Sequence, residues 1–548
     1  MASANNTVEH GTDVLGLLKT LTRARLIAPL RPDRYVRMVA AVRREGMSAT
    51  TGFAIAAARC PDRPGLIDEI GTLTWRELDD RANALAAAFQ GLPSDPSVIG
   101  IMCRNHRGFV SALVAANKIG ADVLLLNTSF AGPALAEVVR REGVDVVVYD
   151  EEFAEPVETA LADVPECVRI LGWTDDPAAH DQTVEKLIAA HAGERPAKSE
   201  RTARLILLTS GTTGSPKGAA RSGGGIGDVK SVLDRTPWRA EETTVVVAPM
   251  FHAWGFGQLA LAAMLANTIV TRRRFDPEAT LELVDRHRAT GLAVVPVMFD
   301  RIMDLPEDVR NRYTCATLRF ASASGSRMRP DVVISFMDQF GDVIYNNYNA
   351  TEAGMIATAT PADLRAAPDT AGTPAVGTRI RILDNDFREV PTGEVGSIYV
   401  HNTTQFDGYT TGNTKDFHDG YMSSGDVGYL DSNGRLFVVG RDDEMIVSGG
   451  ENVYPIEVEK ALAAHPDVGE ATVIGVDDEK FGQRLAAFVV LRDGSSVDAE
   501  ALKQHVRDHL ASYKVPREIV LLDELPRGTT GKIGRKELHA LLADHADG

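Results

Sequence analysis

Hydrophobic and polar positions along residues 52–350 follow the rhythm of strands alternating with helices. One amphipathic stretch begins at Thr74 with Glu77 three residues later, which is the pattern of a helix capping box. Short apolar runs, typical of buried strands, cover residues 98–102, 123–126, 144–149, 205–208, 244–248 and 291–295. Strands that alternate with helices at this spacing predict a parallel sheet in an α/β fold.

The sequence pattern changes beyond residue 372, where short apolar segments typical of β-strands are separated by glycine and proline turns. Apolar runs at 379–383, 396–400 and 435–439 predict a small antiparallel or barrel-like unit. From about residue 443 the pattern predicts a compact α+β tail. Its expected helices begin near 455, 499 and 535, and its expected strands cover 471–476, 485–491 and 519–522.

Residues 1–50 form a basic, partly amphipathic stretch on a chain that is otherwise acidic. Its cations lie among leucine, isoleucine and valine residues, and they are Lys19, Arg23, Arg25, Arg31, Arg34, Arg37, Arg43 and Arg44. We expect a helical extension that packs on the main body. Contact with an anionic membrane surface or with a partner is the alternative.

Residues 248–271 contain no Asp, Glu, Lys or Arg and are long enough to span a bilayer. Polar and helix-breaking residues interrupt the run, including Pro249, His252, Gln258 and Asn267. The segment is therefore predicted to be a buried helix that lines an apolar cavity, and no transmembrane span is expected.

Net charge, apolar content and cysteine distribution exclude several classes of protein. The 548 residues carry a net charge of −18, which argues against nucleic acid as a partner, since that partner favours a basic face. Apolar residues make up 44% of the chain, as in a soluble globular protein. The four cysteines are scattered, and the N-terminus lacks the contiguous apolar core of a signal peptide. We expect a cytoplasmic protein without disulfides or structural zinc.

The strand expected at 205–208 runs into a loop of small hydroxyl and glycine residues, TSGTTGSPKG. Such a loop turns many backbone N–H groups and hydroxyls toward one point, which suits a polyphosphate, and Lys217 adds a positive charge. The spacing does not fit the G-x-x-x-x-G-K-[ST] P-loop, because Lys217 lies between Pro216 and Gly218. A plain glycine-rich turn is the alternative for the loop taken alone.

The full string resembles the phosphate-binding loop of the adenylate-forming superfamily, which includes acyl-CoA synthetases, amino-acid adenylation domains and luciferases. Three further strings resemble motifs of the same superfamily in the same order. They are YNNYNATE at 345–352, SSGDVGY at 423–429 followed by Gly440 and Arg441, and PRGTTGKI at 526–533. The resemblance covers roughly residues 52–545, and acyl-CoA synthetase is the preferred branch.

This resemblance implies an α/β fold class. A large N-terminal domain of stacked α/β sheets with a small β-barrel-like subdomain is expected at 52–442, after a basic extension at 1–51. A small mobile α+β C-terminal domain is expected at 443–548. The implied reaction is attack of a carboxylate on the α-phosphorus of ATP, release of pyrophosphate, and attack of a thiol on the acyl-adenylate.

The cofactors that the resemblance implies are ATP, Mg²⁺ and CoA. Glu352, with Thr209, is expected to hold Mg²⁺, which prefers hard oxygen ligands. Thr351 is expected to bond the phosphate, and Lys532 to reach the α-phosphate and the substrate carboxylate. The remaining nucleotide contacts are expected from Ser210, Gly211, Thr212, Thr213, Gly214, Lys217, Gly325, Ser326, Asn347, Tyr348, Asp426 and Arg441. Each residue taken alone has a plain structural alternative.

Two positions depart from the superfamily pattern. Asn349 stands where the Y-G-x-T-E motif has glycine, and asparagine tolerates unusual backbone angles better than most residues. SGSRM at 324–328 stands where relatives often have G-G-A-P-L beside the adenine, so the nucleotide is expected to be held slightly differently.

PMFHAWGF at 249–256 resembles the motif in which amino-acid-activating members place an aspartate that pairs with the substrate ammonium. Here His252, included among the catalytic candidates, takes that position, and a buried ammonium would lack its counter-ion. An acid without an amine is therefore expected, with Trp254 and Phe256 as walls of an apolar channel. A medium- or long-chain fatty acid is the first expectation and an aryl acid the second.

The superfamily uses one C-terminal domain in two orientations. By motif matching, Asp443 is the expected hinge, and Ser448, Gly449 and Gly450 are expected at the CoA arm. An acyl-AMP ligase that loads a carrier protein and a non-catalytic nucleotide-binding protein are the other function classes considered. A homodimer is left open by the sequence.

Overall fold

Two sheets share one hydrophobic core in the larger of the two compact units into which the chain divides. The computed structural model describes residues 14–93, 95–209, 217–221, 226–402, 408–410, 415–442, 446–448, 451–478, 482–528 and 531–546. The larger unit comprises Met1–Pro368, Ala375–Thr378 and Asn402–Thr414, and the smaller comprises Asp369–Pro374, Arg379–His401 and Lys415–Gly548. By this division the β segments at 379–401 and 415–442 group with the C-terminal residues, whereas the sequence analysis placed them in the N-terminal domain.

The first sheet of the larger unit is parallel in its centre and antiparallel at β13/β14 and β1/β2. Its order is β14 (Gly354–Ala359), β13 (Ile344–Ala350), β12 (Phe320–Ala323), β11 (Gly291–Val294), β9 (Thr243–Val246), β10 (Thr268–Val270), β1 (Pro64–Asp68) and β2 (Gly71–Thr74). The carboxyl ends of β9, β11, β12 and β13 therefore meet at one edge of the sheet.

The second sheet has a parallel centre and an antiparallel edge. Its order is β18 (Gly408–Tyr409), β8 (Lys217–Arg221), β7 (Leu205–Thr209), β4 (Asp122–Leu125), β3 (Val98–Met102), β5 (Val146–Asp150) and β6 (Val168–Trp173). The strands predicted from apolar runs are thus present to within one or two residues at their ends.

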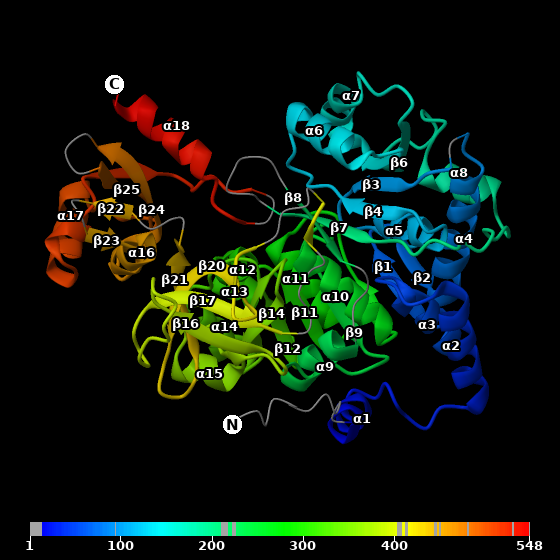
Figure 1. Ribbon diagram of the computed structural model, residues 1–548, viewed down its shortest axis with the longest axis horizontal. Helices are drawn as coiled ribbons and strands as arrows, with labels where there is room; N and C mark the ends of the chain where they lie inside the picture. The colour runs from blue at the N-terminus through cyan, green and yellow to red at the C-terminus, as the bar shows by residue number, and fades with distance from the viewer. Residues whose placement is uncertain are drawn as a thin grey trace, which may run out of the picture. The chain divides into compact units, whose positions relative to one another are not determined.

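Successive residues of the central strands point to opposite faces, and each face buries a separate layer of helices. Helices α4 (Trp75–Gln90) and α5 (Arg107–Lys118) cover one face of the second sheet, and α6 (Gly132–Glu142) and α7 (Ala154–Ala160) cover the other (Figure 1). On β5, Val146 and Val148 pack with α4 and α5, whereas Val147 packs with α6 and α7. The core of α4 and α5 also contains residues of the first sheet, Val246 and Phe320 among them. The expectation of stacked α/β sheets is confirmed.

Further helices of this unit cover the first sheet or lie around the two sheets. α11 (Pro277–Arg286), α12 (Pro296–Met303) and α14 (Pro330–Phe340) form a second core against β9, β11, β12 and β13. The remaining helices are α1 (Val14–Arg23), α2 (Pro32–Glu45), α3 (Thr51–Arg59), α8 (Val184–Ala190), α9 (Ile226–Arg235), α10 (Ala253–Met264), α13 (Glu307–Arg310) and α15 (Pro361–Ala366). The capping box expected at Thr74 and Glu77 is present at the start of α4.

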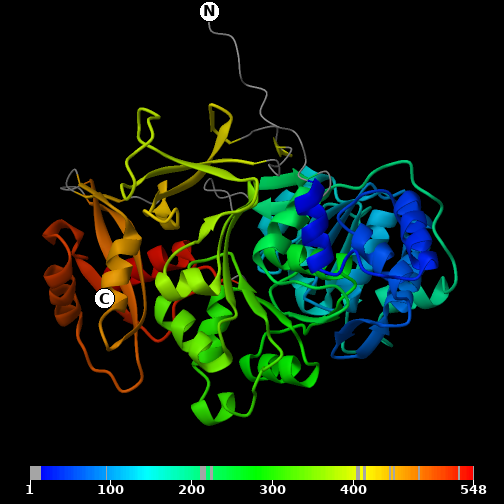
Figure 2. The ribbon, with the colours of Figure 1, turned by 90° about the horizontal axis from the view of Figure 1, so that it is seen from below.

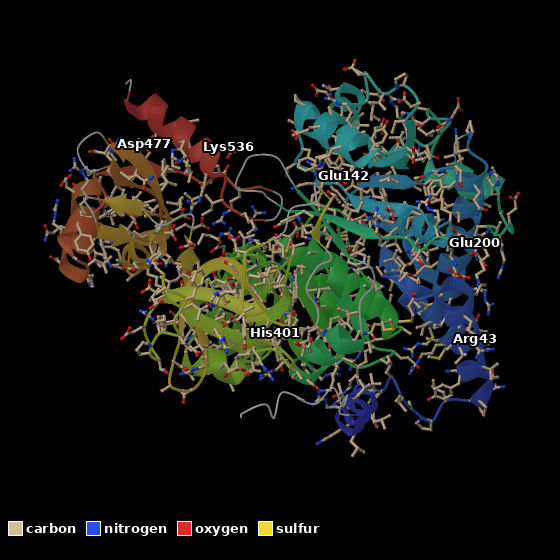
Figure 3. All side chains as sticks on the ribbon, viewed as in Figure 1. Arg43, Glu142, Glu200, His401, Asp477 and Lys536 are labelled. Carbon is tan, nitrogen blue, oxygen red and sulfur yellow. The ribbon has the colours of Figure 1, made fainter. Side chains whose placement is uncertain are left out.

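The N-terminal helices are anchored by polar contacts. Arg23 donates to the carbonyl of Leu233, which places α1 beside α9 (Figure 2). Arg59, only 2% exposed on α3, donates to the carbonyls of Arg25 and Leu26 at 2.9 Å each. The outer side of α2 carries exposed Tyr35, Val36 and Val39, with Arg43 at the periphery (Figure 3).

The smaller unit contains two further sheets. The antiparallel one has the order β16 (Arg379–Leu383), β17 (Gly396–His401), β20 (Tyr421–Leu430) and β19 (Phe417–His418), with β21 (Leu436–Arg441) paired to β20. The other has the order β23 (Glu451–Val453), β22 (Ile446–Ser448), β25 (Gly482–Leu491) and β24 (Val468–Asp478), with β26 (Glu518–Leu522) parallel to β25. α16 (Pro455–Ala463) and α17 (Ala499–His509) cover one face of the latter, and α18 (Arg535–Ala546) the other.

All four cysteines are buried, and none is paired in a disulfide. Burial raises the thiol pKa of Cys60 and Cys167 to about 11 and that of Cys315 to about 12. Among the described residues, no helix is both long and apolar enough to cross a membrane. The uncharged run at 248–271 instead contains α10, whose residues Leu259, Ala262 and Ala263 are fully buried.

Candidate active site

Glu352 lies at the tip of the β13–β14 hairpin. The two strands pair from Asn346 with Ala359 to Ala350 with Gly354, which leaves Thr351, Glu352 and Ala353 in the turn. Gly354 has a φ of +71°, a left-handed conformation that glycine adopts without strain. Glu352 is 9% exposed, and its Oε1 accepts a 2.5 Å hydrogen bond from the phenol of Tyr409. A buried carboxylate held at the sheet edge offers the hard oxygen that Mg²⁺ prefers, so this position fits that ion.

Asn347 is a structural amide within the same hairpin. Its Nδ2 donates to Ser322 Oγ at 2.9 Å and to the Ala323 carbonyl at 3.2 Å, and its Oδ1 accepts from Thr358 Oγ1 at 3.1 Å. The side chain therefore joins β12, β13 and β14. The nucleotide contact expected of Asn347 stays a prediction, and the neighbouring Tyr348 is half-buried.

The two departures from the superfamily pattern have plain structural consequences. Asn349 pairs with Met355 in β13 and has no positive φ, so it does not need the unusual backbone angles considered for it. Gly325, just beyond β12, has a φ of +107°, and a Cβ there would meet no atom within 4 Å. Gly325 and exposed Ser326 thus lie at the same sheet edge as Glu352, because β12 and β13 are parallel neighbours.

His252 lies beyond β9 at the start of α10. It occupies the N-cap position, where its carbonyl accepts from the N–H of Phe256 at 2.9 Å, and its half-buried ring lies 4.3 Å from that of Phe251. Trp254 Nε1 donates to the carbonyl of Val294 at 2.8 Å, and Phe256 is buried in the core. Both aromatic residues expected to wall an acyl channel are therefore packed against the sheet.

The phosphate-loop motif is framed by β7 and β8. Thr209 ends β7 and pairs with Lys217, which begins β8. Ser210, Gly211, Thr212, Thr213 and Gly214 lie outside the described residues. β18 pairs antiparallel with β8, Tyr409 opposite Ala219, and the Tyr409 phenol reaches Glu352. The hairpin that carries the phosphate-loop motif is thereby joined to the hairpin that carries Glu352.

Asp426 and Arg441 face each other across β20 and β21 in the smaller unit. They are register partners, and Arg441 Nη1 lies 3.6 Å from Asp426 Oδ1. Gly425 has a φ of +79°, and a Cβ there would lie 3.3 Å from Arg441 Nη2 and 3.4 Å from Lys415 Nζ. The carboxylate expected to bind the ribose is therefore paired with Arg441, and Lys415 lies beside the neighbouring Gly425.

Lys532 is exposed on a tight loop near the end of the smaller unit. The N–H of Gly528 donates to the Lys532 carbonyl at 2.9 Å, and Arg527 pairs with Ile533 as an isolated bridge. Arg527 is itself held by the Gly531 carbonyl and by Glu470, each at 2.7 Å. Ser448 ends β22 and pairs with Glu451, while Asp443, Gly449 and Gly450 lie outside the described residues.

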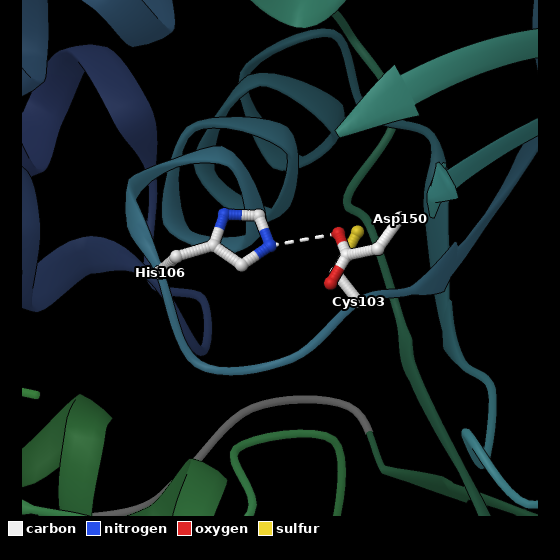
Figure 4. A group of neighbouring side chains, drawn as sticks. All are labelled: Cys103, His106 and Asp150. Carbon is white, nitrogen blue, oxygen red and sulfur yellow. Dashed lines mark hydrogen bonds and ion pairs between the residues drawn. The ribbon is translucent and has the colours of Figure 1, made fainter. Parts of the chain in front are cut away.

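Cys103, His106 and Asp150 form a buried cluster in the larger unit (Figure 4). His106 Nδ1 accepts from the N–H of Gly108 at 3.0 Å, so the ring proton is on Nε2, which donates to Asp150 Oδ1 at 2.8 Å. A metal would need the lone pair that this proton occupies. Burial raises the pKa of the Cys103 thiol well above its usual value, and Asp150 adds to the effect. His106 and Asp150 are therefore a buried hydrogen-bonded pair, with the Cys103 thiol beside them.

Sequence reasoning missed Tyr409 and Asn402. Tyr409 bonds the Glu352 carboxylate, and Asn402 Nδ2 donates to the Ala353 carbonyl at 2.7 Å, so both hold the hairpin tip. The available signal was weak, a Gly-Tyr dipeptide at 408–409 between the second and third segments of the expected antiparallel unit. Tyr409 and Glu352 are 57 residues apart along the chain, and no local pattern predicts their contact.

Comparisons with known proteins agree with this geometry. An indoleacetate–CoA ligase from Aromatoleum aromaticum is 30% identical over 484 residues, covering 86% of this chain and 93% of the relative. A 2-succinylbenzoate–CoA ligase from Geobacillus sp. is 30% identical over 507 residues, covering 89% and 96%. The structure of o-succinylbenzoate CoA synthetase from Bacillus subtilis with its acyl-adenylate intermediate is similar, with a TM-score of 0.74 and 26% identity, covering 89% of this chain and 97% of that one.

The stacked sheets, the phosphate-loop hairpin and the Glu352 hairpin define an adenylate-forming enzyme. Residues 53–410 match the AMP-binding enzyme family and residues 457–532 its C-terminal domain, and the chain belongs to that family. Adenylate-forming CoA ligases use ATP, Mg²⁺ and CoA.

Proposed function

We propose that the chain is an AMP-forming acid–CoA ligase. It joins a carboxylic acid to ATP as an acyl-adenylate, releases pyrophosphate, and transfers the acyl group to the CoA thiol. The observation that carries this proposal is the link from the phosphate-loop hairpin through Tyr409 to Glu352. It joins two motifs that an adenylation site requires and that lie more than a hundred residues apart.

Each charged residue has a role that follows from the reaction. ATP and a carboxylate bring like charges together, so the site needs cations and fixed dipoles more than a strong base. We propose that Glu352 holds Mg²⁺, which would neutralise phosphate charge, and that Thr351 bonds the phosphate. Asp426 accepts hydrogen bonds from the ribose hydroxyls, and Arg441 orients Asp426.

The acid is proposed to be apolar and to lack an amine. His252 follows Phe251 at the start of α10, where amino-acid-activating relatives carry a carboxylate, so a substrate ammonium would have no counter-ion there. The first expectation, a medium- or long-chain fatty acid, stays a prediction. The two CoA ligases reported above act on indoleacetate and 2-succinylbenzoate, which supports an aryl acid about equally.

The packing of α10 bears on this choice. Trp254, which is half-buried, donates to the Val294 carbonyl at the end of β11, and Phe256 is buried in the core. A compact aryl acid needs less apolar volume than a long chain does, so the apolar volume of the acyl site decides between the two classes.

The test is mass spectrometry of products from ATP, Mg²⁺, CoA and a panel of fatty, aryl and amino acids. Acyl-CoA and AMP formed from fatty or aryl acids, and not from amino acids, is the expected result. Acyl-adenylate without acyl-CoA would point to a carrier protein as the acceptor. Strong pyrophosphate exchange with an α-amino acid alone would overturn the proposed substrate class.

A further inference from the structure

A short segment contacts the tip of the Glu352 hairpin through two hydrogen bonds. We name its described residues, Asn402 and 408–410, the clamp segment. Asn402 is 8% exposed and donates to the Ala353 carbonyl at 2.7 Å, while Tyr409 donates to Glu352. Thr410 Oγ1 donates to Glu142 Oε1 at 3.0 Å, and β18 pairs with β8. The segment is therefore tied to the hairpin tip, to α6 and to the second sheet.

The two ties to the hairpin tip differ in what they hold. Asn402 bonds a main-chain carbonyl, and so it fixes the backbone of the turn. Tyr409 bonds a side-chain carboxylate at 2.5 Å, within the range of charge-assisted O–H···O⁻ hydrogen bonds. An ionised carboxylate only accepts, and a phenol brings no charge, so the bond orients Glu352 without neutralising it. Among the described residues, the hydrogen bond recorded for Glu352 uses Oε1, which leaves Oε2 as the oxygen for a cation.

We propose that Tyr409 is a positioning residue for the metal carboxylate of this enzyme. It fixes the rotamer of Glu352 through Oε1 and so preorganises Oε2 for the divalent ion that accompanies ATP. Partners that orient a metal ligand contribute to metal affinity without touching the metal. Because β18 lies on β8, the same side chain also sets the carboxylate relative to the strand that follows the phosphate-loop motif. This inference rests on the proposed function.

The experiment compares the full-length wild type with Tyr409→Phe, which removes one hydroxyl and keeps the ring. Mn²⁺ binding is titrated by electron paramagnetic resonance in the presence of α,β-methylene-ATP, and binding of that analogue is also measured in EDTA. Tyr409→Phe is expected to bind Mn²⁺ roughly 10–100-fold more weakly while its analogue affinity in EDTA stays unchanged. If the Tyr409 hydroxyl only stabilised the fold, Tyr409→Phe would lower the melting temperature and its Mn²⁺ affinity would equal that of the wild type.

Tyr313→Phe is the matched control, because Tyr313 also donates to a carboxylate, Glu278 Oε1 at 3.0 Å, away from the site. It should bind Mn²⁺ as the wild type does. Wild-type Mn²⁺ affinity in Tyr409→Phe would overturn the inference alone, whereas a wild type that binds no Mn²⁺–nucleotide would overturn the proposed function. If Tyr409→Phe fails to fold, Tyr409→Met replaces it, because methionine also lacks the hydroxyl that bonds Glu352, and wild-type Mn²⁺ affinity in that variant would equally overturn the inference.

Discussion

At the scale of single residues, the Asp426–Arg441 pair makes the sharpest prediction about the nucleotide. Asp426→Ala removes a charged acceptor whose hydrogen bonds to the ribose are each worth roughly 1.5–3 kcal/mol, so ATP should bind at least about tenfold more weakly. Isothermal titration with ATP measures the change. Asp431→Ala is the control, since Asp431 pairs with Arg435 at 2.7 Å in the same hairpin and should leave the ATP affinity unchanged. Equal ATP affinity in both variants would place Asp426 outside the site.

Single residues also show which features can be predicted from the sequence and which cannot. Thr74 and Glu77 are predictable because a capping box is local, and both of its hydrogen bonds are present. Glu352, Asp426 and Lys532 are predicted as site residues because they belong to strings that resemble superfamily motifs. Tyr409 was not predicted because its partner comes from a distant hairpin. For Asn347, the sequence does not reveal that three groups of the sheet bond its side-chain amide.

At the scale of elements, strands are predictable from apolar runs because both faces of each parallel sheet are covered. The sheet order is not, since β10 and β1 pair across about 200 residues and only tertiary packing selects them. The same limit applies to the buried helix α10. Its lack of charge predicts burial, but not whether it lines a cavity or fills a core.

The anchoring of the N-terminal helices depends on Arg59. Arg59→Met removes a buried cation that bonds two carbonyls and Glu241 Oε1 at 2.8 Å, so the free energy of unfolding should fall by roughly 3–5 kcal/mol. Urea denaturation measures it. Arg63→Met is the control, because Arg63 pairs with the same carboxylate but its side chain is 47% exposed, and it should cost at most about 1 kcal/mol.

Deletion of residues 1–50 should likewise lower stability, because α1 and the segment that follows it are bonded to the body. The competing expectation is a membrane role for this basic extension. Salt-sensitive co-sedimentation of the intact protein with anionic liposomes, lost on deletion, would contradict a role limited to packing.

His505 on α17 bonds the backbone of α16, and its titration should make the free energy of unfolding depend on pH. His505 donates to the Ala461 carbonyl at 3.0 Å, and its ring lies 4.9 Å from that of His465 and 4.3 Å from that of His509. Burial lowers the pKa of His505, with both neighbouring histidines adding to the effect and Asp508 and the Ala461 hydrogen bond opposing it.

The folded state therefore binds fewer protons than the unfolded state just below the ordinary histidine pKa of 6.5. The free energy of unfolding should fall as the pH drops through this range, and it should fall less in His505→Gln. Urea denaturation at pH 7.5 and 5.5 compares the two slopes. His180→Gln is the control, because His180 bonds Glu151 in the other unit. An identical loss in the wild type and in His505→Gln would contradict the assignment.

At the scale of the whole molecule, the superfamily resemblance predicts two half-reactions that separate by mutation. Lys532→Ala removes a cation from the first step and should slow adenylation by about 10²–10³, while leaving thioester formation from supplied acyl-adenylate nearly intact. Gly449→Leu should do the reverse by blocking the thiol, and Asp443→Pro should damage one step more than the other by trapping one orientation.

Pyrophosphate exchange reports the first step, and release of AMP from synthetic acyl-adenylate with CoA reports the second. Equal losses in both steps for Lys532→Ala and Gly449→Leu would contradict the use of two orientations. The C-terminal α+β fold was predictable from the pattern after residue 443, but the hinge rests on motif matching alone.

The burial of all four cysteines has a practical consequence for following such a rearrangement. Their thiols are inaccessible and, with raised pKa values, scarcely ionised at neutral pH, so maleimide reagents should leave the native protein unlabelled. Cysteines introduced at exposed Glu200 and Lys536, one in each unit, would then be the reactive thiols and could carry a donor and an acceptor fluorophore. The natural chain is in effect already a cysteine-light background for single-molecule energy transfer, and the transfer efficiency with ATP, and then with CoA, would report the catalytic cycle in real time.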